Sequence, residues 1–376
     1  MRSSSEKKLI ILIIIVVVLV LAIAGFILYA FLSNGNNSAQ NDMNFQMYND
    51  TTSREPVVVG NNITQNTVVA VENTDNNQAQ TPISGKTDTS NYYYKQLSDT
   101  AKKIYDELKN HKEDMKSGTY EIDFGTEFNS ILSAKDGEEI LNEEYQSAWN
   151  AFSYDNVDLF YLDISKISMT IEARTEGGTT TYYVKIGPGD YSSYLNSTFA
   201  NKQEIEDAEE YIIDIRRQVM DILGPYDNAM KIKVVNEWMI DNLSYEDREG
   251  NNNKYNLYGA IVETKVVCEG YARMFKYIMD GLDIPSILVS GTATNSDGQT
   301  ELHAWNYVEL NGQWYAIDVT WNDPVVIGDG ELTDSQKSKY LLKGKSFLND
   351  HEEDGMISEN SMEFTFPTLN NADYIF

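Results

Sequence analysis

The sequence is short of cysteine, and its basic residues are half as numerous as its acidic ones. Cys268 is the only cysteine in 376 residues, so no disulfide can form within the chain. Lys and Arg number 29 against 58 Asp and Glu, which gives a formal net charge of −29. Such an acidic surface repels nucleic acid and anionic lipid headgroups, so we expect neither as a binding partner. A chain of this length buries a core large enough to fold without a disulfide or a structural metal ion.

Charge is missing altogether from residues 9–32, an uninterrupted apolar run of 24 residues. About 20 apolar residues at 1.5 Å rise cross a bilayer, so the run predicts a transmembrane helix. Residues 1–8 carry three basic side chains and one acidic one, which predicts a cytoplasmic tail. The chain is then a single-pass protein of the cell membrane, and the residues after 32 lie outside the cytoplasm. A signal peptide cleaved after Ala22-Ile23-Ala24 is the competing interpretation, but the apolar run continues too far for a typical signal core.

Composition divides the remainder of the chain. Residues 33–91 are rich in Asn, Thr, Gln and Ser without apolar periodicity, which predicts a disordered linker. Residues 92–200 form a small predicted α+β region, and 201–376 a second domain. The patterns predict helices over 92–116, 138–154, 201–223 and 227–243, and a β-hairpin over 164–186 that turns at Gly177-Gly178.

Cys268 lies at the start of another predicted helix. Apolar residues from Ala272 to Met279 repeat at helical spacing, and Gly281 supplies a C-terminal stop. The unpaired N–H groups and the dipole of a first helical turn lower the pKa of a thiol and favour an oxyanion. The alternative interpretation is that Cys268 is a small buried apolar residue.

His303 and Asp318 are predicted to meet on one face of a β-hairpin. Two strand-like runs, 302–309 and 313–320, are joined by Asn311-Gly312, which is a strong two-residue turn signal. That turn pairs Leu310 with Gln313 and makes Asp318 the diagonal neighbour of His303. A carboxylate at this position fixes the tautomer of the imidazole. A surface His and Asp pair without a role is the alternative.

Four short segments resemble the transglutaminase-like superfamily, in particular its bacterial surface members related to papain-type peptidases. These segments are Tyr258-Gly259-Ala260, Val267-Cys268-Glu269-Gly270-Tyr271-Ala272, His303-Ala304-Trp305-Asn306 and Asp318-Val319-Thr320-Trp321. The resemblance implies an α+β fold whose core packs helices on an antiparallel sheet. It further implies Cys268 as nucleophile, His303 as base and Asp318 as orienting carboxylate. The Cys268 N–H would supply part of the oxyanion hole, and Tyr258 is the candidate for its second donor.

These residues predict an extracytoplasmic thiol enzyme that cleaves or transfers amide bonds of protein or cell-wall peptide through a thioester. Water as acceptor makes it a peptidase or amidase, and an amine makes it a cross-linking transglutaminase. The competing interpretation is a catalytically idle transglutaminase-like binding module displayed on the cell surface. The sequence decides neither question, and it gives no oligomeric state.

We expect no cofactor and no metal ion. The acidic turns at 295–298 and 329–331 lack the other ligands of a calcium loop and are interpreted as plain turns. His351 is a candidate second base. Because it lies in the polar stretch from Asn349 to Glu353, we expect it to be solvated.

Overall fold

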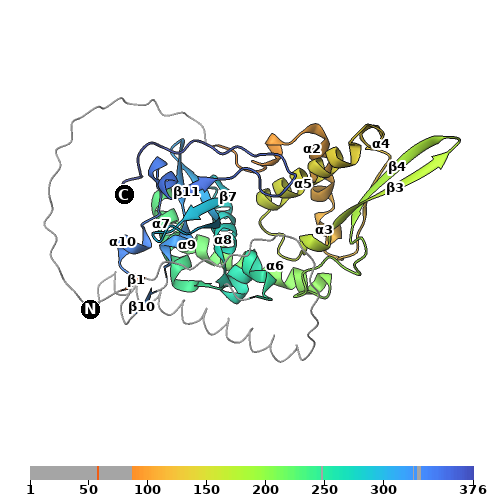
Figure 1. Ribbon diagram of the computed structural model, residues 1–376. Coiled ribbons are helices and arrows are strands. Elements are labelled where there is room, and N and C mark those ends of the chain that lie inside the picture. Colours follow the sequence, from red (N-terminus) through yellow and green to blue (C-terminus); the bar gives the residue numbers. More distant parts are fainter. Residues whose placement is uncertain (1–56, 59–86, 247–248, 325, 328–331) are drawn as a thin grey trace, which may run out of the picture. The chain divides into compact units, whose positions relative to one another are not determined.

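The computed structural model describes residues 57–58 and 87–376, apart from 247–248, 325 and 328–331 (Figure 1). The described residues belong to one compact unit. The predicted tail (1–8), transmembrane helix (9–32) and most of the linker (33–91) lie outside the described residues. Among the residues that are described, none of the helices has the length and apolar character needed to cross a bilayer.

The region from 92 to 200 is α+β, as predicted. Its elements are η1 (Tyr94–Gln96), α2 (Asp99–Asn110), α3 (Lys112–Met115), β2 (Ile122–Gly125), α4 (Asn129–Leu132), α5 (Gly137–Asp155), η2 (Ile164–Lys166), β3 (Ser168–Glu176) and β4 (Thr179–Gly187). The three strands form an antiparallel sheet in the order β2-β4-β3. The predicted hairpin is confirmed, because Gly177 and Gly178 turn with φ of 59° and 86°.

The single helix predicted over 92–116 is wrong. Ser98 is extended and accepts a hydrogen bond from the Ala101 N–H through its side chain, so the long helix begins only at Asp99. A second break at His111 separates α2 from α3. The apolar periodicity predicts one continuous helix here, but the Ser98 side chain caps α2 and so sets where the helix begins.

The C-terminal region combines helices with a four-stranded antiparallel sheet. Its elements are α6 (Lys202–Leu223), α7 (Asn228–Asn242), β5 (Ser244–Tyr245), η3 (Asn252–Tyr255), the π-helical η4 (Gly259–Glu263), β6 (Lys265–Val266), α8 (Cys268–Gly281), β7 (Ser286–Thr294), β8 (Thr300–Leu310), β9 (Gln313–Ile317), α9 (Val319–Asn322), β10 (Val326–Ile327), α10 (Asp334–Lys337), η5 (Lys345–Asn349) and β11 (His351–Glu353). The sheet order is β11-β7-β8-β9, and α8 packs on β7 and β8. Two short parallel pairs, β5 with β6 and β10 with β1 (Val57–Val58), lie outside this sheet.

The predicted hairpin register is confirmed between β8 and β9. Leu310 pairs with Gln313, and the ladder runs in that register as far as Asn306 and Ile317. The strand ends there, three residues before the predicted end, because Asp318 becomes the N-cap of α9. Its side chain accepts a hydrogen bond from the Trp321 N–H at 3.1 Å.

The 92–200 region packs against the sheet and helix that carry the site. The Tyr93 hydroxyl donates to the Leu288 carbonyl on β7. Arg273 on α8 donates to the carbonyl and the hydroxyl oxygen of Ser153, each at 2.9 Å. These contacts are buried, so both regions belong to one packed body. The domain boundary at residue 200 stays a prediction from the sequence.

Candidate active site

Cys268 is the first residue of α8, as predicted. Val267 precedes it with an extended backbone, and its N–H donates to the Lys254 carbonyl at 3.0 Å. Gly270 allows this turn to lie close to its surroundings, since a Cβ there would come within 2.5 Å of Val266 and 2.7 Å of the Lys254 carbonyl oxygen. The Cys268 side chain is buried, with 7% of the residue exposed. The nucleophile position is therefore held by backbone contacts on the side facing η3 and β6.

His303 and Asp318 meet as the hairpin predicted. His303 Nε2 lies 2.8 Å from Asp318 Oδ2, and both residues are buried. An ionised carboxylate only accepts hydrogen bonds, so His303 donates from Nε2 and keeps its lone pair on Nδ1. Among the described residues, no hydrogen-bond partner contacts this buried Nδ1. The base is thus oriented by a fixed carboxylate.

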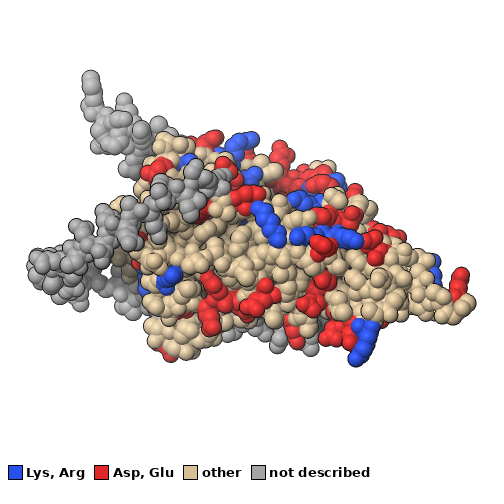
Figure 2. Space-filling model, turned by 90° about the horizontal axis from the view of Figure 1, so that it is seen from above, with Lys and Arg blue, Asp and Glu red and all other residues tan. Residues whose placement is uncertain are grey.

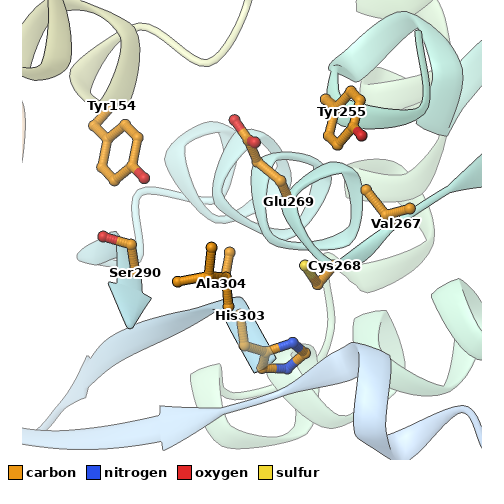
Figure 3. A pocket seen from close by; sticks show the side chains of 9 residues that line it. Tyr154, Tyr255, Val267, Cys268, Glu269, Ser290, His303 and Ala304 are labelled. Atoms are coloured by element: carbon orange, nitrogen blue, oxygen red, sulfur yellow. The ribbon is translucent and has the colours of Figure 1, made fainter. Parts of the chain in front are cut away.

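Cys268 and His303 line the same pocket (Figure 3). Its lining residues are Tyr154, Tyr255, Val267, Cys268, Glu269, Ser290, Leu302, His303 and Ala304. In Figure 3, Tyr154 and Tyr255 flank the carboxylate of Glu269, and the Cys268 side chain and the His303 ring border the same hollow. A thiol and an imidazole that line one pocket are the parts needed for nucleophilic catalysis.

Residues 217–319 match the family model of the transglutaminase-like superfamily. The chain carries a transglutaminase-like core. The matched segment includes Cys268, His303 and Asp318. No curated protein matches the chain.

Three solved structures are similar to parts of the chain. A TGase has 15% sequence identity and a TM-score of 0.28, and the alignment covers 45% of this chain and 48% of that one. An arylamine N-acetyltransferase from Bacillus cereus has 17% identity and a TM-score of 0.24, with coverages of 29% and 49%. The periplasmic domain of TgpA from Pseudomonas aeruginosa has 12% identity and a TM-score of 0.24, with coverages of 42% and 65%. This chain therefore spans about half of the first two, and the assignment rests on the family model.

Tyr258, the candidate second oxyanion donor, is not among the residues lining the pocket of the transglutaminase-like core. Its ring lies against Phe160 and Phe199, with centroid distances of 6.0 and 5.2 Å. Tyr255 lines the pocket instead, together with Tyr154 from α5. The sequence carried no signal for Tyr154, which lies more than 100 residues before Cys268 in a region outside the family match.

The expectation that His351 is solvated is wrong. Its side chain is completely buried, with Nε2 3.3 Å from Asp318 Oδ2 and Nδ1 2.7 Å from Asp350 Oδ1. The cause is β11, which pairs His351 with Ala293 on β7 and so brings a polar stretch onto the sheet edge. His351 also lies outside the matched segment, so the family resemblance gave no signal for it.

The three buried groups fix one another's ionisation. Burial alone would raise the pKa of Asp318, but the charges and hydrogen bonds of His303 and His351 hold it well below its ordinary value. Burial alone would lower the pKa of His351, but hydrogen bonds and charges from Asp318 and Asp350 raise it above the usual histidine value. Asp318 is therefore a carboxylate at any physiological pH.

Donor atoms of His303, Asp318 and His351 lie within 4.8 Å of one another. In this structure these atoms bond to each other at 2.8 and 3.3 Å and form a hydrogen-bonded cluster. At 295–298 the Asn295 side-chain oxygen accepts from the Asp297 and Gln299 N–H groups, so it is used by its own turn. Residues 329–331 lie outside the described part of the chain.

Proposed function

We propose that this chain is a thiol acyl-transfer enzyme acting on amide bonds of protein or cell-wall peptide. Cys268 is the nucleophile, His303 the general base and Asp318 the orienting carboxylate. One observation carries the proposal: a buried carboxylate holds His303 by Nε2, and His303 and Cys268 line the same pocket. The family match of residues 217–319 supports it.

The chemistry follows from these positions. His303 Nδ1 takes the thiol proton, and the Cys268 sulfur attacks the amide carbonyl. The Cys268 N–H, which lies in the first turn of α8, donates to the oxyanion. His303 then returns the proton to the leaving amine as the C–N bond breaks, which leaves a thioester. The acceptor, water or a primary amine, gives a proton to His303 and attacks the thioester, so that the thiol is restored.

The test uses the single cysteine as its own reporter. We expect iodoacetamide to label Cys268 of the full chain rapidly well below the reference thiol pKa of about 8.5. This reactivity should disappear in His303→Ala. A matched control is His111→Ala, because His111 also lies between two carboxylates, Glu107 and Asp114, but on the surface of α2 and α3. Labelling that follows an ordinary thiol, unchanged by His303→Ala, would instead favour the binding-module alternative.

The reaction products show whether water or an amine is the acceptor of the acyl group. Incubating the protein with a mixed-protein substrate and a fluorescent primary amine separates the two outcomes by mass spectrometry. Amine incorporated at glutamine side chains identifies a transglutaminase, and new peptide termini or released ammonia identify a peptidase or amidase. A Cys268→Ser variant should remove either product.

We also propose that residues 9–32 anchor the protein in the cell membrane, with the enzyme part outside. The uncharged run and the basic flank before it support this proposal. Protease accessibility of intact cells checks it, because an outward-facing protein is degraded without lysis. Protection until the cells are lysed would reject the orientation.

A further inference from the structure

A second imidazole lies behind the His303–Asp318 pair. Asp318 Oδ1 accepts the Trp321 N–H at 3.1 Å, while Oδ2 receives both His303 and His351, at 2.8 and 3.3 Å. On its other side, His351 contacts Asp350, whose second oxygen accepts the Tyr340 hydroxyl at 2.9 Å. The arrangement is a continuous buried chain from Asp350 through His351 and Asp318 to His303.

Each ring nitrogen of His351 faces a carboxylate oxygen. Since ionised carboxylates only accept, both nitrogens must carry a proton, and the ring is a cation. The charged and titratable groups that face it are Asp350 beside it, Asp318 at the start of α9, and His303 on β8. The charge of Lys339 acts on His351 only indirectly, because it lowers the pKa of Asp350.

Aromatic rings enclose the same imidazole. Phe347 stacks on it with a centroid distance of 3.9 Å, and Trp321, Trp305 and Tyr340 lie at 4.6, 5.1 and 5.5 Å. Ring faces attract a cation, most strongly where water is excluded. Both the carboxylates and the aromatic rings therefore stabilise the charged form, in agreement with the raised pKa of His351.

We propose that His351 is a charged positioning residue that holds Asp318 in place and limits how strongly this carboxylate attracts a proton onto His303. The inference rests on the proposed function, for which His303 is the base. His351 does not touch the pocket and acts only through Asp318. It is a fourth member of the site that neither the hairpin nor the family match contains.

The consequence for the base follows from charge. The His303 and His351 rings have centroids 5.7 Å apart, and they share one carboxylate oxygen. A nearby like charge disfavours protonation of His303, and Asp318 divides its negative charge between the two rings.

The test is ¹⁵N NMR of the full chain labelled at histidine, in which the three imidazoles give separate signals. We expect the His351 ring to stay doubly protonated over the whole range in which His303 titrates. In His351→Gln, which keeps a neutral donor for Asp318 but removes the charge, His303 should titrate about one pH unit higher. The surface control His111→Gln should leave His303 unchanged.

Two results would overturn the inference. One is a His351 ring with a single proton at neutral pH. The other is an unmoved His303 titration in a folded His351→Gln variant that only loses thermal stability, which marks a structural role. If His351→Gln does not fold, Asp350→Asn replaces it. Removing one of the two carboxylates should make His351 lose its proton at lower pH, and His303 should then titrate higher.

Labelling of Cys268 separates this inference from the proposed function. If Cys268 is labelled like an ordinary thiol and the NMR result is as expected, the proposed enzyme function is rejected but the charged state of His351 is retained. An activated thiol combined with an unmoved His303 titration rejects only the role of His351.

Discussion

Asp318 uses its two carboxylate oxygens for different tasks. Oδ1 caps α9 through the Trp321 N–H, and Oδ2 binds two imidazoles. The cap fixes the side-chain rotamer, so Oδ2 can point only at the rings. Asp318 thereby connects the end of β9, the start of α9 and the general base His303.

Replacing Asp318 with Asn tests this division. An amide oxygen can still cap α9, but the negative charge that keeps the proton on His303 Nε2 is lost. We expect labelling of Cys268 at pH 6 to slow by about tenfold or more. Stopped-time iodoacetamide labelling measures it, and Asp297→Asn in an exposed turn is the matched control. Unchanged labelling would show that Asp318 does not act on the base.

Asp155 carries a pH dependence of stability that is separate from the site. Burial raises its pKa to about 6, although it accepts the Tyr93 and Tyr94 N–H groups at 3.1 and 3.0 Å. Because the folded-state pKa is above the unfolded value, this stabilising contribution is complete below about pH 4 and is lost as pH rises through 6.

We therefore expect Asp155→Asn to remove a decline in the free energy of unfolding between pH 4 and 7. The decline amounts to at most about 3 kcal/mol. Urea unfolding of both proteins across this range measures it, and Asp136→Asn on the surface should retain the wild-type slope. Parallel curves for Asp155→Asn and wild type would contradict the assignment.

At the scale of elements, β11 depends on a glycine in its neighbour. A Cβ on Gly291 of β7 would lie 1.9 Å from the Glu352 carbonyl oxygen and 2.7 Å from the Trp305 ring. Only glycine lets β11 approach closely enough for His351 to reach Asp318. The contact between His351 and Asp318 therefore depends on the pairing of β11 with β7.

Gly291→Ala should push β11 away from β7. We expect a loss of about 1–3 kcal/mol in stability, as for other overpacked sites. The ¹⁵N signals of His351 should also change toward a singly protonated ring. Gly224→Ala is the control, because its Cβ would meet only the Asp221 carbonyl oxygen at 3.5 Å. An unaltered His351 signal would show that β11 tolerates the methyl group.

The elements also show what the sequence could predict. The β8–β9 hairpin and its register were accessible because Asn311-Gly312 fixes the pairing locally. The helix starting at Cys268 was accessible because its apolar face repeats over several turns. β11 was not, because three residues contain no period and their pairing with β7 joins segments about 60 residues apart. That long-range pairing is why the position of His351 was missed.

At the scale of the molecule, the 92–200 region supplies part of the pocket wall through Tyr154 and buries polar groups of α8 through Ser153. Acidic side chains are spread over the face shown in Figure 2 and do not gather in one patch. The contacts that join the two regions include the buried hydrogen bonds from Tyr93 to Leu288 and from Arg273 to Ser153. Their loss would remove the Ser153 acceptors of Arg273 and uncover the surfaces of α8 and β7 that the 92–200 region now buries.

A fragment of residues 201–376 should consequently fail to fold cooperatively. Such a fragment exposes apolar surface of β7 and α8 that the 92–200 region covers, and a typical domain is only marginally stable. Circular dichroism with thermal unfolding measures this, and a fragment of residues 87–376 is the control that should melt in one transition. A cooperative transition in the shorter fragment would establish residue 200 as a true domain boundary.

The late position of β11 has a consequence for biosynthesis. Roughly 80 residues separate Cys268 from His351, and at cellular elongation rates these take roughly 4–17 s to make. During that interval the thiol has already been translated, while the imidazole that holds Asp318 does not yet exist. The nascent protein is thus kept from acquiring its complete reactive centre until the segment that carries His351 has been added.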